Sequence, residues 1–255
     1  MNTETLTYHS DTEFKRLFVE QTVKHREGDR YIQRSYSNSQ EADKFRGCSV
    51  GCSVMSLKLM GRNGIDWDDH AGLANLLGWP DWLILLQEEI FEGLPLSDAV
   101  MWTEKLASAV PVGIEIGMVK FRFLSFLMEE NVNLVASLEL DPALKNQVIE
   151  SIKSVKNLHD RVVISGELDA DARSAARFEV EAARSAARYA ARFEVRFEVE
   201  AARSAARFAA ASAAARSAAA RSGAASVEFA ASSATRFEAF LRFSRKLIEL
   251  LVKST

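Results

Sequence analysis

The residues that could do chemistry lie among the first 70 residues of the chain. His25 and Asp29 are four residues apart on a predicted helix and therefore share one of its faces. Cys48 and Cys52 have the same spacing in the segment GCSVGC, and a later helix opens at His70. Gln33 continues the face of His25 and Asp29, and Tyr36 follows at the helix end. The candidate binding site therefore consists of His25, Asp29, Gln33, Tyr36, Cys48, Cys52 and His70.

Three interpretations fit this set of side chains. Two cysteines and two histidines could hold a tetrahedral zinc ion, although the chain lacks the C-x-x-C spacing of the common zinc motifs. Cys48 could instead be a nucleophile activated by a helix N-terminus and by His25 or His70. Alternatively, both thiols are small buried apolar side chains, and His25 and Asp29 form a hydrogen-bonded pair that closes the core. The residue pattern favours the last interpretation and leaves the cofactor unknown.

Composition excludes several classes of protein. The net charge of -3 lacks the basic excess that is typical of nucleic-acid binding. The two cysteines are too close together to staple a fold, which favours a reduced, cytoplasmic setting. The N-terminus does not have the pattern of a signal peptide, and the chain contains no run of about 18 apolar residues that could span a membrane. We therefore expect a cytoplasmic protein that uses neither nucleic acid nor a membrane.

The elements that must position these residues are helices. A helical pattern runs from Asp11 to Arg34, a buried helix follows Gly47, and a third helix capped by Asp66 ends near Gly78. The next helix begins at Pro80. A short strand at 134–140 is a weaker alternative. The sequence predicts a mostly α fold.

Composition also divides the chain into two regions. The four prolines, and every tryptophan, cysteine and histidine, precede residue 166. We expect a helical globular domain over residues 1–165, followed by an Ala/Arg-rich tail of long helices over residues 166–255 with a break near Gly223.

The tail carries an internal repeat, FEVEAARSAAR, which starts at Phe178 and again at Phe197. Its aromatic residues fall on one face of a helix, and such a face needs a partner surface. A helical hairpin that turns near Gly223 and one uninterrupted, self-associating helix both satisfy this need. Glutamates offset most of the arginines, so the tail is not read as an RNA-binding stripe. The predicted partner is a second copy of the chain.

The chain resembles a family of uncharacterised bacterial and phage proteins. The resemblance runs through HREGDRYIQRSY, GCSVGC, HAGLANLLGWPDWLILLQEEIFEGLP and the FLSFL that follows PVG. It implies a small helical domain with an Ala/Arg-rich tail and assigns no reaction. Its members carry glycine at the position of Arg34 and tryptophan at the position of Ser37. The signature residues are His25, Asp29, Gly47, Cys48, Gly51, Cys52, His70, Phe91, Glu92, Leu94 and Pro95.

These observations favour a non-enzymatic binding or sequestration protein that self-associates through its tail and takes a protein partner or a small ligand. The resemblance suggests an accessory factor of a mobile element. The alternative is a metal- or cysteine-dependent hydrolase that uses His25, Asp29, Cys48, Cys52 and His70.

Overall fold

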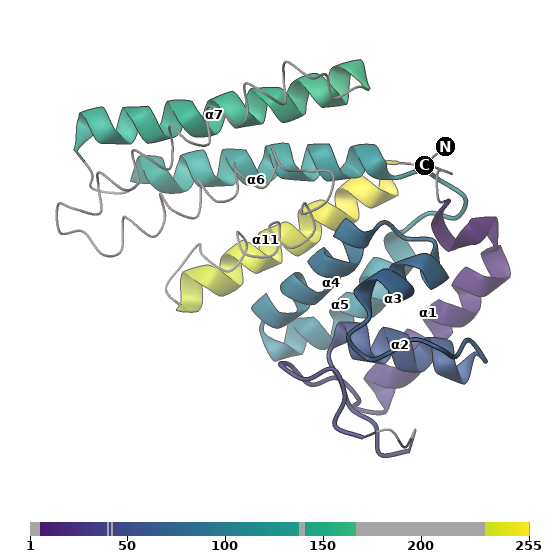
Figure 1. Ribbon diagram of the computed structural model, residues 1–255. Coiled ribbons are helices and arrows are strands. Elements are labelled where there is room, and N and C mark those ends of the chain that lie inside the picture. Colours follow the sequence, from purple (N-terminus) through teal and green to yellow (C-terminus); the bar gives the residue numbers. More distant parts are fainter. Residues whose placement is uncertain (1–5, 40, 42, 138–140, 167–232, 255) are drawn as a thin grey trace. The chain divides into compact units, whose positions relative to one another are not determined.

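The computed structural model describes residues 6–39, 41, 43–137, 141–166 and 233–254. Within these ranges every regular element is a helix (Figure 1). The mostly α fold expected from the sequence is therefore confirmed. The alternative of a strand at 134–140 is wrong where it can be compared, because residues 134–137 are helical. The elements are η1 (Thr7–Ser10), α1 (Thr12–Glu27), α2 (Ser49–Leu59), α3 (His70–Leu77), α4 (Asp81–Gly93), α5 (Leu96–Ala109), α6 (Gly117–Ser137), α7 (Pro142–Ser165) and α11 (Ser233–Val252).

Contacts divide the chain into two compact units. The first unit is Met1–Gly117 together with Phe240–Thr255, and the second is Met118–Ala239. The end of the expected tail therefore groups with the N-terminal helices. Residues 167–232, with the predicted break at Gly223, lie outside the described residues, so the long helices expected there stay a prediction.

Helix α2 is the central element of the first unit. It contacts α1, α3 and α4, and its residues 49–57 are all buried. Helix α5 packs against α1 and α4. The serines of α2 are tolerated in the core because their hydroxyls find partners: those of Ser53 and Ser56 each donate at 2.8 Å to a carbonyl oxygen four residues earlier. The buried helix predicted after Gly47 is confirmed.

Helix ends follow local signals, with one correction. The carboxylate of Asp11 accepts a hydrogen bond from the Phe14 N–H at 2.9 Å and caps α1. The predicted cap at Asp66 is wrong, because Asp69 accepts from the Gly72 N–H at 2.8 Å and α3 begins at the next residue. Helix α3 ends at Gly78 as expected.

The last helix is seated on α4. A Cβ atom at Gly93 would overlap the ring of Phe240, so a glycine is needed for this close approach. Leu247 and Leu251 of α11 are fully buried. The C-terminal part of α11 therefore contributes to the core of the first unit.

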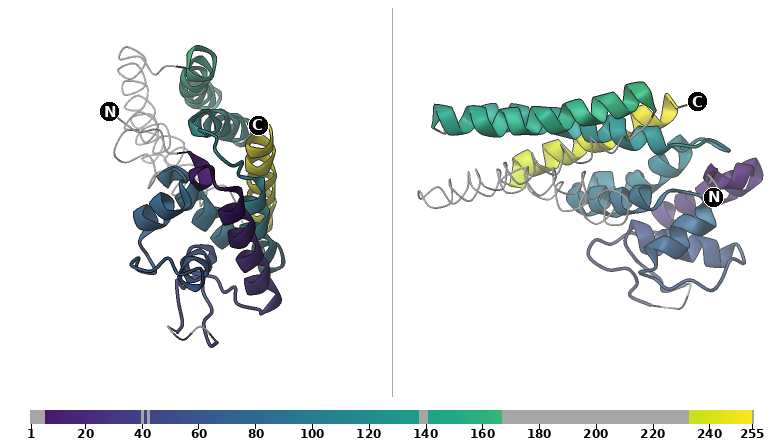
Figure 2. Two further views of the ribbon diagram at one scale, coloured as in Figure 1. Left: turned by 90° about the vertical axis from the view of Figure 1, so that its right-hand side faces the viewer. Right: turned by 45° about the horizontal axis from the view of Figure 1, so that its top comes forward.

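The second unit contains α6 and α7, which lie side by side in both views of Figure 2. The hydroxyl of Ser125 on α6 donates to the carboxylate of Asp160 on α7, and Lys156 pairs with the same carboxylate at 2.8 Å. His159 is buried, neither ring nitrogen has a hydrogen-bond partner within the described ranges, and burial lowers its pKa to about 4.

No helix in the described part of the chain is long and apolar enough to cross a membrane.

Candidate functional site

The loop that follows α1 is held against the start of α2. The N–H of Ile32 donates to the Gly47 carbonyl, and that of Gly47 donates to the Arg30 carbonyl, both at 2.9 Å. Tyr36 comes closest to the helix: a Cβ atom at either Gly47 or Gly51 would overlap its carbonyl oxygen. The two glycines of GCSVGC therefore allow the loop backbone at Tyr36 to pack directly against the start of α2, which fixes the position of Tyr36.

The same loop is tied to the end of α4. The side-chain amide of Gln33 donates to the carbonyl oxygens of Phe91 at 2.8 Å and Leu94 at 2.9 Å. The N–H of Arg34 donates to both carboxylate oxygens of Glu92, at 2.9 and 3.0 Å. Gln33 thus satisfies carbonyl groups that the helix end leaves without partners, and it positions the loop.

His70 stands at the start of α3 between two acceptors. Its Nδ1 lies 2.9 Å from the carbonyl oxygen of Asp68, and its Nε2 lies 2.6 Å from Oε2 of Glu88 on α4. The hydrogen bond with Glu88 raises the pKa of His70 above its usual value, against the opposing effect of burial. With an acceptor at each nitrogen, the imidazolium form satisfies the site best.

Tyr36 completes this arrangement. Its ring meets the ring of His70 edge to face, with centroids 5.8 Å apart. Burial and the neighbouring Glu88 carboxylate raise the pKa of the Tyr36 hydroxyl, so it stays protonated near neutral pH. We call Tyr36, His70, Glu88 and Glu92 the polar face.

Glu92 differs from Glu88 because Glu88 is paired with His70 and Glu92 is not paired with a cationic side chain in the described ranges. Burial raises the pKa of Glu92, and the charge of Glu88 adds to this effect. The hydrogen bond from the Arg34 N–H and the charge of the Arg34 side chain oppose it. Within the described ranges the Glu92 carboxylate has no ion pair. Cys48 adjoins this region, because the charges of Glu88 and Glu92 contribute to a pKa that burial raises to about 12.

A second group of predicted residues is packed in the core. The ring of His25 lies 6.3 Å from that of Tyr31 and 6.0 Å from that of Phe45. Burial lowers the pKa of His25 to about 4, and the nearby Arg30 charge lowers it further in the same direction. We call His25, Tyr31, Phe45 and Cys52 the aromatic cluster. Cys52 is fully buried with its thiol 3.4 Å from the Gly47 carbonyl oxygen.

Asp29 belongs to neither group. The prediction that it shares a helix face with His25 is wrong, because α1 ends at Glu27 and Asp29 has a left-handed φ of 50°. Its side chain is 83 % exposed and pairs with Arg46 at 2.8 Å. Gln33 is likewise outside α1, and its side chain reaches α4 instead of continuing a helix face.

The structure therefore separates the seven predicted site residues by environment. Tyr36 and His70 meet directly, Cys48 adjoins them, and Gln33 positions their loop. His25 and Cys52 lie in the aromatic cluster, and Asp29 is at the surface. Among the described residues, no three His, Cys, Asp or Glu side chains are arranged to hold a metal ion.

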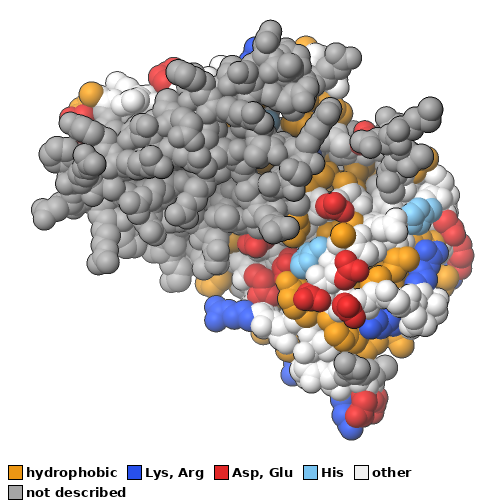
Figure 3. Space-filling model, in the orientation of Figure 1, with side chains coloured by type: hydrophobic (Ala, Val, Ile, Leu, Met, Phe, Trp, Pro, Cys, Tyr) orange, Lys and Arg blue, Asp and Glu red, His pale blue; other side chains and the backbone are white. Residues whose placement is uncertain are grey.

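Glu88 is not among the predicted site residues, and Glu92 is named only as a signature residue of the resemblance. A usable signal was present: residues 63–104 contain no Lys or Arg, whereas acidic residues recur through them. Asp and Glu side chains gather around histidines on the face of the molecule shown in Figure 3. Glu88 and Glu92 are four residues apart and therefore lie on one face of α4.

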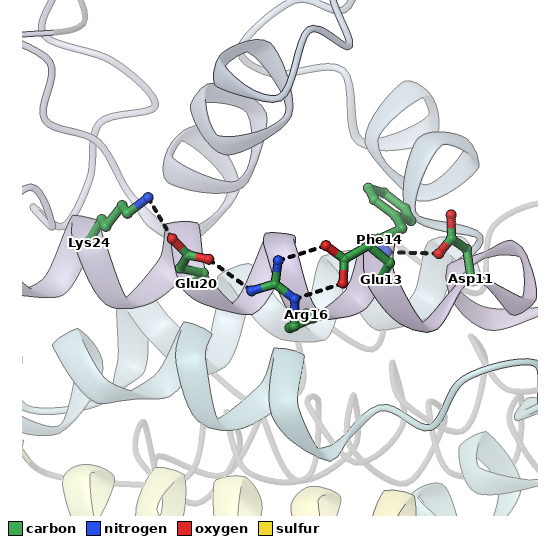
Figure 4. A network of polar contacts seen from close by, with 6 residues as sticks. All are labelled: Asp11, Glu13, Phe14, Arg16, Glu20 and Lys24. Atoms are coloured by element: carbon green, nitrogen blue, oxygen red, sulfur yellow. Dashed lines mark hydrogen bonds and ion pairs between the residues drawn. The ribbon is translucent and has the colours of Figure 1, made fainter.

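Acidic residues on α1 show the opposite arrangement. Arg16 pairs with Glu13 at 2.6 Å and with Glu20 at 3.2 Å, and Lys24 pairs with Glu20 at 2.8 Å (Figure 4). These side chains form a solvent-exposed ladder in which each carboxylate has a cation. The polar face instead holds two carboxylates with one histidine.

No family model matches the chain, and neither a curated protein nor a solved structure matches it. The resemblance to uncharacterised bacterial and phage proteins stays a prediction.

Proposed function

We propose that this chain is a non-enzymatic binding protein that captures a basic protein segment on its polar face. The observation that carries the proposal is the half-buried carboxylate of Glu92, which is held beside Glu88 and makes no ion pair in the described part of the chain, although the charge of Arg34 acts on it. A guanidinium or ammonium group from a partner would supply the missing charge.

The polar face is also built to keep its shape. Tyr36 is fixed by its close approach to the two glycines, and Gln33 and Arg34 tie the same loop to α4. A preorganised site loses less conformational entropy when a ligand binds. These contacts favour recognition by a rigid surface.

The partner we propose is a second copy of this chain. Residues 201–221 carry four arginines and no acidic residue, whereas residues 63–104 carry no Lys or Arg. Opposite charge in two separate segments favours an encounter between copies and fixes their orientation. Self-association through the tail would then bring its arginines to the polar face.

The alternative of a cysteine-dependent hydrolase receives less support. A nucleophilic cysteine must be a thiolate, and reactive cysteines are partly exposed in electropositive surroundings. Burial raises the pKa of both thiols, and the carboxylates near Cys48 raise it as well. Cys48 is 1 % exposed and Cys52 is fully buried.

The test is the binding of a synthetic peptide with the sequence of residues 201–221. We expect Glu88→Gln with Glu92→Gln to weaken this binding by between about fivefold and about thirtyfold, the loss of one or two charged contacts of about 1 kcal/mol each. The weakening should shrink in high salt. Calorimetric titration of the full chain gives the affinities.

The matched control is Glu13→Gln with Glu20→Gln. It removes the same two charges from a part of the surface where both carboxylates already have cations. If both double variants weaken binding equally, the loss comes from the change in net charge alone, and the proposed site is wrong. A peptide with its arginines replaced by glutamine should not bind. A wild-type chain that sediments as a monomer at all concentrations would exclude the second copy as the partner.

A further inference from the structure

A groove between α5 and the part of α11 that belongs to the first unit is distinct from the polar face. Its cavity has a volume of about 280 Å³. Leu94 and Trp102 form its floor and are 2 % and 1 % exposed, and Leu241 and Ile248 of α11 contribute an apolar wall. This space suits a small molecule with an apolar middle.

Trp102 is a fixed part of this floor. Its indole N–H donates to the carbonyl oxygen of Gln87 at 2.9 Å, and both groups are buried. The ring therefore cannot rotate into the groove without losing a buried hydrogen bond. The apolar surface of the groove is present before any ligand arrives.

Charged side chains of both signs line the same groove. Asp98 and Lys105 are seven residues apart on α5, a separation of about 10 Å along the helix axis. Trp102 lies between them, and Arg245 stands on α11. Within the described residues, Lys105 and Arg245 have no ion pair, and the Asp98 carboxylate is near only the hydroxyl of Ser97, at 3.4 Å. The opposite charges therefore remain available to a ligand.

We propose that this groove binds a small zwitterion, an ω-amino acid with its ammonium at Asp98 and its carboxylate at Lys105 and Arg245. The chain between the two charges would lie over Trp102. A simple anion would place its apolar part against Asp98, and a simple cation would leave Lys105 and Arg245 unmatched. A zwitterion matches the charges of both signs and the apolar floor at once.

The probe is 6-aminohexanoate, compared with hexanoate and with hexylamine. Binding to the full chain is followed by the indole N–H resonance of Trp102 and by calorimetry. We expect the zwitterion to bind about fivefold more tightly than either single-charge analogue, the ratio that one exposed ion pair supplies at the upper end of its usual range. Equal affinity for all three probes, or no binding of 6-aminohexanoate, would overturn the proposal.

Two variants separate the two ends of the groove. Asp98→Asn should lower the affinity for 6-aminohexanoate about fivefold. It should not weaken hexanoate, because the apolar end of hexanoate then no longer faces a charge. Lys105→Gln with Arg245→Gln should weaken both carboxylate probes and leave hexylamine unchanged. Hexanoate binding by Asp98→Asn also verifies that the groove is intact in that variant. Unchanged 6-aminohexanoate binding by Asp98→Asn would contradict the assignment.

The control replaces a charge pair elsewhere, Glu13→Gln with Arg16→Gln on α1, and should leave all three affinities as they are. Ser244→Trp fills the groove from α11 and should abolish the Trp102 shift caused by 6-aminohexanoate. A Trp102 shift that survives this filling would place the bound molecule outside the groove and contradict the proposal.

Discussion

The aromatic cluster and the polar face contain one histidine each. Burial by itself lowers the pKa of both, but only the histidine of the polar face has a carboxylate partner. His25 is 6 % exposed, its Nε2 has no hydrogen-bond partner among the described residues, and its pKa falls to about 4. His70 has an acceptor at each nitrogen, and its pKa rises. Desolvation disfavours the charged form of both rings, and only a carboxylate partner reverses the outcome. A histidine is therefore a neutral core residue in the aromatic cluster and a charged, hydrogen-bonded residue in the polar face.

The two histidines also act on stability in opposite directions. A histidine with a lowered pKa contributes stability that is present above its unfolded pKa and is lost as the pH falls toward its folded pKa. A histidine with a raised pKa contributes stability that is present below its unfolded pKa and is lost as the pH rises through its folded pKa. The first describes His25 and the second describes His70.

The largest expected effect concerns His25. Its pKa of about 4 implies that acidification from pH 7 to pH 4.5 costs about 2–3 kcal/mol of the free energy of unfolding, because the buried ring must become charged. His25→Gln should remove this part of the pH dependence. Urea unfolding at a series of pH values measures it.

The control for His25 is His159 of the second unit, whose pKa is also lowered to about 4. His159→Gln should flatten the acid response separately, so the two variants together should lose more of it than either alone. An unchanged acid slope in His25→Gln would show that the ring is not held neutral in the core.

A smaller effect is expected from the glycine that admits Tyr36. Gly51→Ala places a Cβ atom on the Tyr36 carbonyl oxygen, and we expect a loss of about 1–3 kcal/mol of unfolding free energy from this overpacking. The polar face should be disturbed with it, because Tyr36 contacts His70. Thermal unfolding and the His70 resonance report the two consequences.

Gly28→Ala is the matched control for this change. Its Cβ atom would lie 3.1 Å from the Lys24 carbonyl oxygen, a tight but adjustable contact. It should cost less than Gly51→Ala and leave the His70 resonance in place. Equal losses in the two variants would mean that the approach of Tyr36 is not what requires the glycine at position 51.

The smallest expected effect is a gain. Arg34 has a left-handed φ of 65°, which costs an L-residue about 1–2 kcal/mol. Arg34→Gly removes that cost. Glycine also gives the unfolded chain more conformational entropy, which destabilises the folded state by about 0.5–1 kcal/mol. We therefore expect a net rise in stability of about 0.5 kcal/mol. Arg34→Ala should give no such gain, and a loss of stability in Arg34→Gly would show that the Arg34 side chain is needed.

The helices of the first unit could be predicted because Asp11, Gly78 and Pro80 mark their ends and because α2 consists mainly of small and apolar residues. The arrangement of the site could not. The helical pattern continues past Glu27, so nothing local shows that the chain turns at Gly28 and carries Asp29 to the surface. Whether His25 or His70 meets a carboxylate depends on α4, which is distant in sequence from both.

In the sequence, Glu88 looks like an ordinary solvent-exposed carboxylate. Only tertiary packing brings His70 to it. The Glu88 side chain is 19 % exposed, because His70 at the start of α3 and Tyr36 in the loop before α2 both lie against it. The spacing of Cys48 and Cys52 is compatible with a reactive site and with two buried apolar side chains, and the residue pattern favours the second interpretation. Both side chains are buried, and burial raises the pKa of both thiols.

The most direct test is the titration of the histidine Cε1–H resonances by NMR, with His25→Gln, His70→Gln and Glu88→Gln used to assign and perturb them. We predict that His70 titrates above about 6.5, the value of an unperturbed histidine, and that Glu88→Gln lowers the pKa of His70. His25 should stay neutral until about pH 4. Titration of both rings near the unperturbed value, with no response of His70 to Glu88→Gln, would contradict the division into a buried core and a charged site.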